Sequence, residues 1–140
     1  MPGEFNLYTD IQVRFSDTDG MGHVNNAMFL SYLEFARMHY WKELTGLTEF
    51  GKADFIMARV ELDYRSPIMP GETVRAHIRI SRIGGSSFDF AYRLEERDSR
   101  RLLAEGKTVQ ACYDYSKNKV KRMAPELRAK IEKLEGDRLA

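Results

Sequence analysis

The sequence predicts an α+β protein in which an antiparallel five-stranded sheet wraps around one long central helix. Three observations predict this fold. The stretch 27–33 contains no charge and opens a long helical pattern, as is typical of a helix buried on most sides. Alternation of apolar and polar residues, which indicates strands, precedes that pattern once and follows it four times. Each alternating segment has one apolar face, as in an antiparallel sheet covered on one side.

The first strand is expected within residues 5–16. Ile11, Val13 and Phe15 alternate there with polar residues, which predicts a half-buried strand that ends near Phe15. The strand is therefore expected to lead directly into the polar turn that follows.

The central helix is expected to follow a polar turn over residues 16–26. Asn25 or Asn26 suits the N-cap position, and Gly46 suits the C-cap. Charged residues begin at Glu34, so the C-terminal half of the helix is expected to emerge toward solvent.

Four more strands are expected from residue 54 onward, following one another in meander order. They are separated by Pro67–Gly71, by Gly84–Gly85 and by the charged run Glu95–Arg101. A short surface helix is expected at about 125–135, where Pro125 suits the first helical position.

Length and composition indicate a single domain over residues 1–140, with a core at about 5–116. The 22 Lys and Arg residues nearly balance the 21 Asp and Glu residues, which gives no reason to expect a nucleic-acid partner. Cys112 is the one cysteine, so no intramolecular disulfide can form and a cytoplasmic location is expected. No apolar run approaches the roughly 20 residues of a membrane span. An open sheet leaves unpaired edges, so we expect a homodimer, or a homotetramer built from such dimers.

The polar turn and its surroundings resemble the hot-dog fold acyl-CoA thioesterases, above all the 4-hydroxybenzoyl-CoA thioesterase and YbgC-like group. The resemblance covers about residues 11–115, and the segments 64–72 and 81–88 contribute to it. Its most specific part is an Asp-x-Asp pair, followed seven residues later by an asparagine and then by an aromatic residue: Asp17, Asp19, Asn26 and Phe29.

The resemblance implies hydrolysis of an acyl-CoA to the free acid and CoA, without a cofactor, at a site on the dimer interface. Asp19 would be the catalytic carboxylate, acting as nucleophile or as general base. The backbone N–H of Asn26 would polarise the thioester carbonyl at the positive end of the central helix. Without the resemblance, an aspartate in a turn is more often a structural residue than a catalytic one. We keep this structural interpretation for Asp17.

Other residues of the motif have two interpretations each. His23 either contacts substrate or orients water, or it is a structural loop histidine. Asn25 either caps the helix or contacts substrate, and Phe29 either lines an acyl tunnel or belongs to the core. Three scattered histidines have no metal-ligand spacing, so no metal is expected.

The best candidates for binding CoA lie on the turn from Arg82 to Ser87. An arginine gives charge-assisted contacts to phosphate, and glycines leave backbone N–H groups free. Arg82, Ser86 and Ser87 are therefore predicted to bind substrate, although an ordinary hairpin with a solvent-facing arginine is an equally good interpretation.

Two other functions are compatible with this fold. A dehydratase or hydratase would need a carboxylate placed by a Pro-Gly helix start, whereas Pro70-Gly71 here opens a strand pattern. A non-catalytic acyl-CoA-binding module would keep the fold without needing Asp19. A panel of acyl-CoAs assayed for thiol release separates these alternatives.

Overall fold

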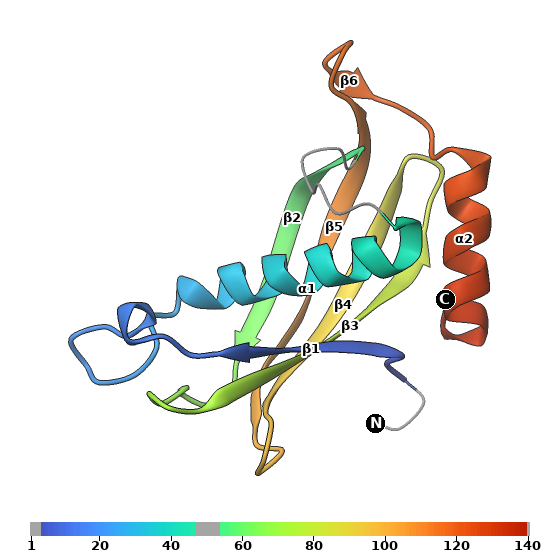
Figure 1. Ribbon diagram of the computed structural model, residues 1–140. Coiled ribbons are helices and arrows are strands. Elements are labelled where there is room, and N and C mark those ends of the chain that lie inside the picture. Colours follow the sequence, from blue (N-terminus) through green and yellow to red (C-terminus); the bar gives the residue numbers. More distant parts are fainter. Residues whose placement is uncertain (1–3, 47–53, 140) are drawn as a thin grey trace.

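The computed structural model describes residues 4–46 and 54–139. Figure 1 shows one long helix lying across a face of a twisted sheet, with a second helix at its side. The expected five-stranded antiparallel sheet around a single central helix is thereby confirmed. The elements are β1 (Leu7–Gln12), α1 (Met28–Thr45), β2 (Phe55–Tyr64), β3 (Thr73–Ile83), β4 (Ser87–Glu96), β5 (Leu102–Asp114), β6 (Lys119–Val120) and α2 (Pro125–Glu135), with 3-10 turns at Phe15–Asp17 and Gly136–Arg138.

The strand order corrects one expectation, because the four later strands do not form a simple meander. The order is β1-β3-β4-β5-β2, so β2 lies beside β5 at one edge, and β6 adds a short pair to β5. After β2, the N–H groups of Arg65 and Ser66 still donate to the carbonyl of Leu103. The chain then crosses to the opposite edge, where β3 begins beside β1. Alternation predicts strands but does not say which strands are neighbours.

α1 packs its core face against the sheet and ends at Gly46, whose φ of 77° confirms the predicted C-cap. The expected emergence toward solvent after Glu34 is wrong, because burial continues to Trp41. Arg37 stays buried by donating a hydrogen bond to the Tyr92 hydroxyl at 3.2 Å. On its outer face the helix exposes apolar residues: Leu30, Phe35 and Met38.

β2 does not have the buried face that its alternating sequence predicts. Only Phe55 is buried, and Ala58 and Val60 are exposed. The strand lies at the sheet edge, and rings of α1 meet it at both ends: Phe29 with Tyr64, and Trp41 with Phe55. Its middle therefore presents apolar residues on an open edge.

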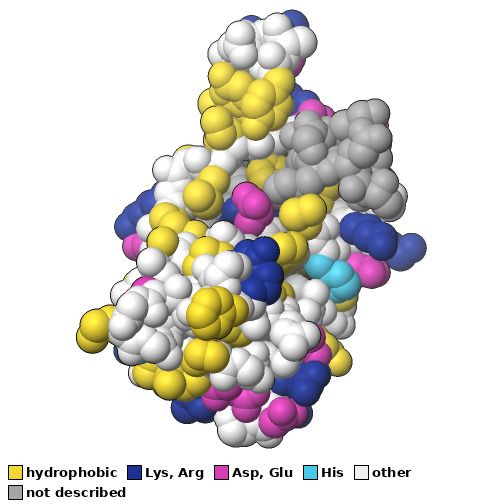
Figure 2. All heavy atoms as spheres, turned by 60° about the vertical axis from the view of Figure 1, so that its left-hand side comes forward, with side chains coloured by type: hydrophobic (Ala, Val, Ile, Leu, Met, Phe, Trp, Pro, Cys, Tyr) yellow, Lys and Arg dark blue, Asp and Glu magenta, His cyan; other side chains and the backbone are white. Residues whose placement is uncertain are grey.

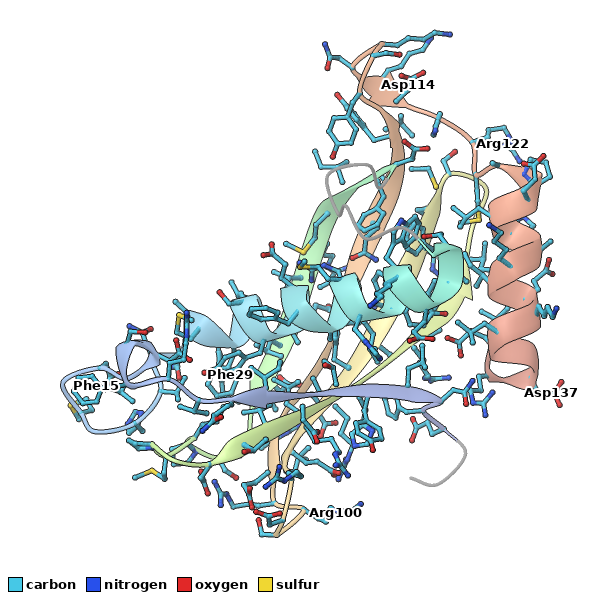
Figure 3. The ribbon with its side chains drawn as sticks, in the orientation of Figure 1. Phe15, Phe29, Arg100, Asp114, Arg122 and Asp137 are labelled. Carbon is cyan, nitrogen blue, oxygen red and sulfur yellow. The ribbon has the colours of Figure 1, made fainter. Side chains whose placement is uncertain are left out.

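β1 is shorter than expected and ends at Gln12. Phe15 opens a 3-10 turn instead of ending the strand, and 90% of its side chain surface is exposed, as Figure 3 shows at the loop tip. The cause is local: Asp17 accepts hydrogen bonds from the backbone and guanidinium of Arg14, which turns the chain early.

The predicted C-terminal helix is confirmed as α2, with Pro125 in its first turn. It is anchored to the core by Glu135, which is fully buried. The carboxylate of Glu135 accepts hydrogen bonds from the Tyr40 hydroxyl and from the N–H of Ile80. Within the two described ranges, no helix is long and apolar enough to cross a membrane.

Candidate active site

The polar turn between β1 and α1 is a small hairpin. Thr18 and Val24 form an antiparallel bridge, and the N–H of Asp19 donates to the carbonyl of His23 at 2.9 Å. Val24 is buried, and its N–H donates to Ile68 on the crossover between β2 and β3. The crossover therefore fixes the turn at the end of the sheet where α1 begins, as Figure 1 shows.

Asp17 is a structural carboxylate, as predicted. Only 1% of its surface is exposed, and it accepts four hydrogen bonds, three from Arg14 and one from the Tyr32 hydroxyl. Burial alone would raise the pKa of Asp17, but the hydrogen bonds from Arg14 and Tyr32 outweigh it and hold the pKa below its ordinary value. Burial and the neighbouring Asp17 raise the pKa of Tyr32, which therefore stays a proton donor.

Asp19 lies two residues further on and keeps one carboxylate oxygen available. Its Oδ1 accepts the N–H of Met21 at 2.8 Å, a short turn stabilised by the side chain. Its other oxygen has no hydrogen-bond partner in the described part of the chain. The side chain is half-buried and reaches solvent.

The start of α1 leaves one backbone donor free. The side-chain oxygen of Asn25 accepts the N–H of Ala27, and its carbonyl accepts the N–H of Met28, both at 2.9 Å. The N–H of Asn26 has no partner among the residues described, while its carbonyl accepts the Tyr64 hydroxyl at 3.1 Å. An unpaired N–H at this position is suited to hold a developing negative charge.

A pocket of about 220 Å³ opens beside this helix start. It brings together three of the predicted site residues, and the rings of Phe29 and Tyr64 meet edge to face with centroids 4.9 Å apart. Asp19 does not line the pocket. Its N–H donates to the carbonyl of His23, and His23 is a lining residue. The lining residues are His23, Asn26, Phe29, Tyr64, Arg65, Ser66 and Pro67.

Sequence reasoning gave no role to the second side of this pocket. Tyr64 and Pro67 belong to the segment 64–72 that resembles the family, and Pro67 also begins the predicted break between two strands; the crossover places both residues against the helix start. That segment was the available signal, since a polar and proline-containing stretch directly after a strand is a common place for binding residues.

The residues predicted to bind CoA lie elsewhere in the chain. Arg82, Ser86 and Ser87 are at the end of β3 away from the helix start. Tyr64, which bonds Asn26, is level with Ala76 in the sheet register, and Arg82 lies six residues further along β3, about 20 Å at 3.3 Å per strand residue. The guanidinium of Arg82 also bonds within the protein, to Asp89 at 2.8 Å and to the Ser87 hydroxyl at 3.0 Å. A single copy of the chain therefore does not unite the two halves of the predicted site.

No cluster of three or more His, Cys, Asp or Glu side chains within 4–46 and 54–139 is arranged to hold a metal ion. The groups near the helix start are one available carboxylate, a free backbone N–H and a pair of aromatic rings. The fold and these groups define an α+β protein with an available carboxylate and an unpaired backbone N–H near one end of its central helix.

The family follows from comparison with known proteins. Residues 13–131 match the model of the thioesterase-like superfamily, and the chain belongs to that superfamily. A thioesterase from Thermus thermophilus, solved as a complex with coenzyme A and zinc, is 32% identical over 97% of this chain and 98% of that chain, with a TM-score of 0.87.

Two curated relatives extend the comparison. Uncharacterized protein YsmA of Bacillus subtilis is 34% identical over 88 residues, which cover 63% of this chain and 60% of that protein. The long-chain acyl-CoA thioesterase FadM of Escherichia coli is 25% identical over 91% of this chain and 98% of that protein.

Proposed function

We propose that the protein hydrolyses acyl-CoA thioesters to the free acid and CoA. Asp19 acts as nucleophile or as general base, and the N–H of Asn26 polarises the thioester carbonyl. The observation that carries this proposal is that Asp19, a carboxylate with a free oxygen, is hydrogen-bonded through its N–H to His23, which lines the same pocket as the unpaired N–H of Asn26.

The chemistry of thioester hydrolysis needs both groups. A carboxylate must activate water or attack the carbonyl carbon, and the charge that develops on the carbonyl oxygen must be stabilised. The positive end of α1 adds to the effect of the Asn26 N–H. Tyr64, packed against the buried ring of Phe29, offers apolar surface to the acyl group, and His23 lies where it can contact substrate or a water.

A second copy of the chain completes the site. β2 is an open edge strand whose apolar residues are exposed on both faces, including Ile56, Met57 and Val60. Pairing of two β2 edges across a two-fold axis covers these residues and removes the edge. Figure 2 turns this side of the molecule forward and shows hydrophobic side chains spread over it.

The same pairing unites the two halves of the predicted site. An antiparallel pair of β2 strands brings the Phe55 end of one copy beside the Tyr64 end of the other. The turn that carries Arg82, Ser86 and Ser87 lies toward the Phe55 end, so it approaches the partner's pocket. Coenzyme A is the ligand of the Thermus relative, which supports it as the carrier of the acyl group here.

The experiment is a panel of straight-chain and aromatic acyl-CoAs, assayed for released thiol, together with the mass of the protein in solution by sedimentation. We expect turnover of at least one acyl-CoA and the mass of a dimer or a tetramer. Absence of thiol release over the whole panel contradicts the reaction. Hydration of an enoyl-CoA without thiol release indicates the hydratase alternative instead.

A further inference from the structure

β5 and β6 form a hairpin, residues 113–121, that extends beyond the rest of the sheet. The pairing of β2 with β5 ends at Phe55 and Cys112, whereas β5 continues to Asp114 and turns back into β6. Figure 1 shows this hairpin rising past the end of the sheet, and Figure 3 places Asp114 near its base, well apart from Phe29.

Two side chains tie the β5–β6 hairpin to the start of β2: the Tyr115 hydroxyl donates to the Phe55 carbonyl at 2.8 Å, and Lys121 forms an ion pair with Asp54 at 3.1 Å. Other surface of the hairpin stays uncovered. Tyr115 and Val120 are each 54% exposed. Lys117 and Lys119 have no carboxylate within ion-pair distance in the described ranges. The exposed apolar surface and the two lysines of this projecting hairpin are available for a contact outside the chain.

The hairpin cannot reach the pocket of its own chain. Tyr64, which lines that pocket, lies opposite Ala104 in β5. Ten residues of extended strand separate Ala104 from Asp114, about 33 Å at 3.3 Å per residue. Any contribution of the hairpin to a pocket is therefore made to another copy.

The two-fold pairing of β2 strands gives that contribution a definite place. The hairpin continues past the Phe55 end of its own sheet, and the β2 pairing proposed above puts the partner's Tyr64 end at the same level. Beyond the partner's Tyr64, the chain continues into the segment 65–67 that lines the partner's pocket. The hairpin and this pocket thus lie at the same end of the paired sheets.

We propose that the β5–β6 hairpin of each copy closes the thioester pocket of the other copy, with Lys117 and Lys119 beside the phosphates of a bound acyl-CoA. The proposal rests on the proposed function for the acyl-CoA ligand and for the β2 pairing. It adds a wall from the second copy and two cationic residues that lie outside the Asp-x-Asp motif and outside the Arg82–Ser87 turn.

The first experiment reverses the two charges. The variant Lys117→Glu/Lys119→Glu is expected to raise KM for an acyl-CoA about tenfold or more, since charge-assisted contacts to phosphate are lost. Its kcat is expected to change little, and KM for the matching acyl-pantetheine, which lacks phosphates, is expected to stay unchanged. The control variant Lys130→Glu/Lys133→Glu makes the same charge change on α2 and should leave both KM values unchanged. An equal effect of the two variants, or no effect of the hairpin variant, overturns the proposal.

The second experiment tests whether the hairpin acts on the partner's pocket. Subunits carrying Asp19→Asn are co-expressed, under a separate affinity tag, with subunits carrying Lys117→Glu/Lys119→Glu, and the mixed dimer is purified. In that dimer the intact Asp19 faces an intact hairpin from the other subunit. We expect the wild-type KM at about half the wild-type kcat. A KM as high as that of the hairpin variant shows that the hairpin serves its own subunit, and a monomeric protein removes the pairing altogether.

Failure of the proposed reaction is distinguishable from failure of this inference. If the wild-type protein releases no thiol, binding of CoA itself is measured by titration calorimetry. Weaker binding by the hairpin variant than by the α2 control then supports a phosphate contact at Lys117 and Lys119. Equal binding by the two variants overturns it.

Discussion

Asp17 and Asp19 stand two positions apart on the same turn, and they differ in how many hydrogen bonds each carboxylate accepts. Asp17 is buried and accepts four, from Arg14 and Tyr32. Asp19 is half-buried and accepts one, from the N–H of Met21. The same residue type thus serves the fold at one position and remains available for chemistry at the other, because reactivity needs a lone pair that the protein has not already used.

The largest effect we expect is the loss of hydrolysis in Asp19→Asn. The amide oxygen of asparagine can still accept the N–H of Met21, so the turn and the fold are expected to persist. The charge that activates water or attacks the carbonyl is absent. We expect kcat to fall by at least two to three orders of magnitude in a thiol-release assay, comparable with the loss of an oxyanion donor in other enzymes.

The control for this variant is its unfolding midpoint in urea, which should match that of the wild type. Retained turnover in Asp19→Asn would remove Asp19 from the mechanism. A lowered midpoint would show that Asp19, like Asp17, belongs to the fold, and the contrast between the two residues would disappear.

The converse change, Asp17→Asn, should cost mainly stability. Its amide group would face the donors of Arg14 where a carboxylate now accepts them, and the ion pair between this buried carboxylate and the exposed Arg14 would be lost. We expect a loss of about 3 kcal/mol in the free energy of unfolding, measured by urea denaturation. Thiol release per folded molecule should fall much less than in Asp19→Asn. The opposite ranking of the two variants in activity would contradict the assignment.

The sequence allowed most of the fold to be predicted, because the relevant signals are local. The apolar start of α1, the glycine at its end and the proline at the start of α2 each depend on a few neighbouring residues. The order of the strands depends on the crossover after Tyr64, and no local pattern specifies where that segment crosses. For the same reason the edge position of β2, and with it the exposure of Val60, could not be predicted.

The candidate site divides in the same way. His23, Asn26 and Phe29 are near one another in sequence, and the structure brings them to one pocket. Tyr64 and Pro67 join them through the crossover, which is a long-range feature. The bond from Arg82 to Asp89 joins neighbouring strands at an irregular step in the β3–β4 register, and alternation gives no sign of it.

The difference between the two carboxylates also predicts a pH dependence of stability. The pKa of Asp17 in the folded protein lies below the ordinary value of 3.8 that it has when unfolded. The contribution of Asp17 to the free energy of unfolding is therefore fully present above about pH 4. It is lost as the pH falls through the lowered pKa that Asp17 has in the folded protein. Between neutral pH and about pH 2, the free energy of unfolding should fall more steeply for the wild type than for Asp17→Asn. Parallel pH profiles for the two proteins would contradict this.

The smallest effect we expect comes from Tyr32→Phe, which removes one of the four hydrogen bonds to Asp17 and leaves the ring in place. Tyr32 is almost fully buried on α1, and its hydroxyl donates to Asp17 at 2.9 Å. We expect a loss of about 1–2 kcal/mol in the free energy of unfolding, because the acceptor is charged and buried. In Asp17→Asn the same change should cost less, so the double variant should be more stable than the sum of the two single losses predicts. Additive losses would mean that the hydrogen bond from Tyr32 to Asp17 contributes nothing to stability. The hydrogen bonds from Arg14 would then be the ones that stabilise the buried carboxylate.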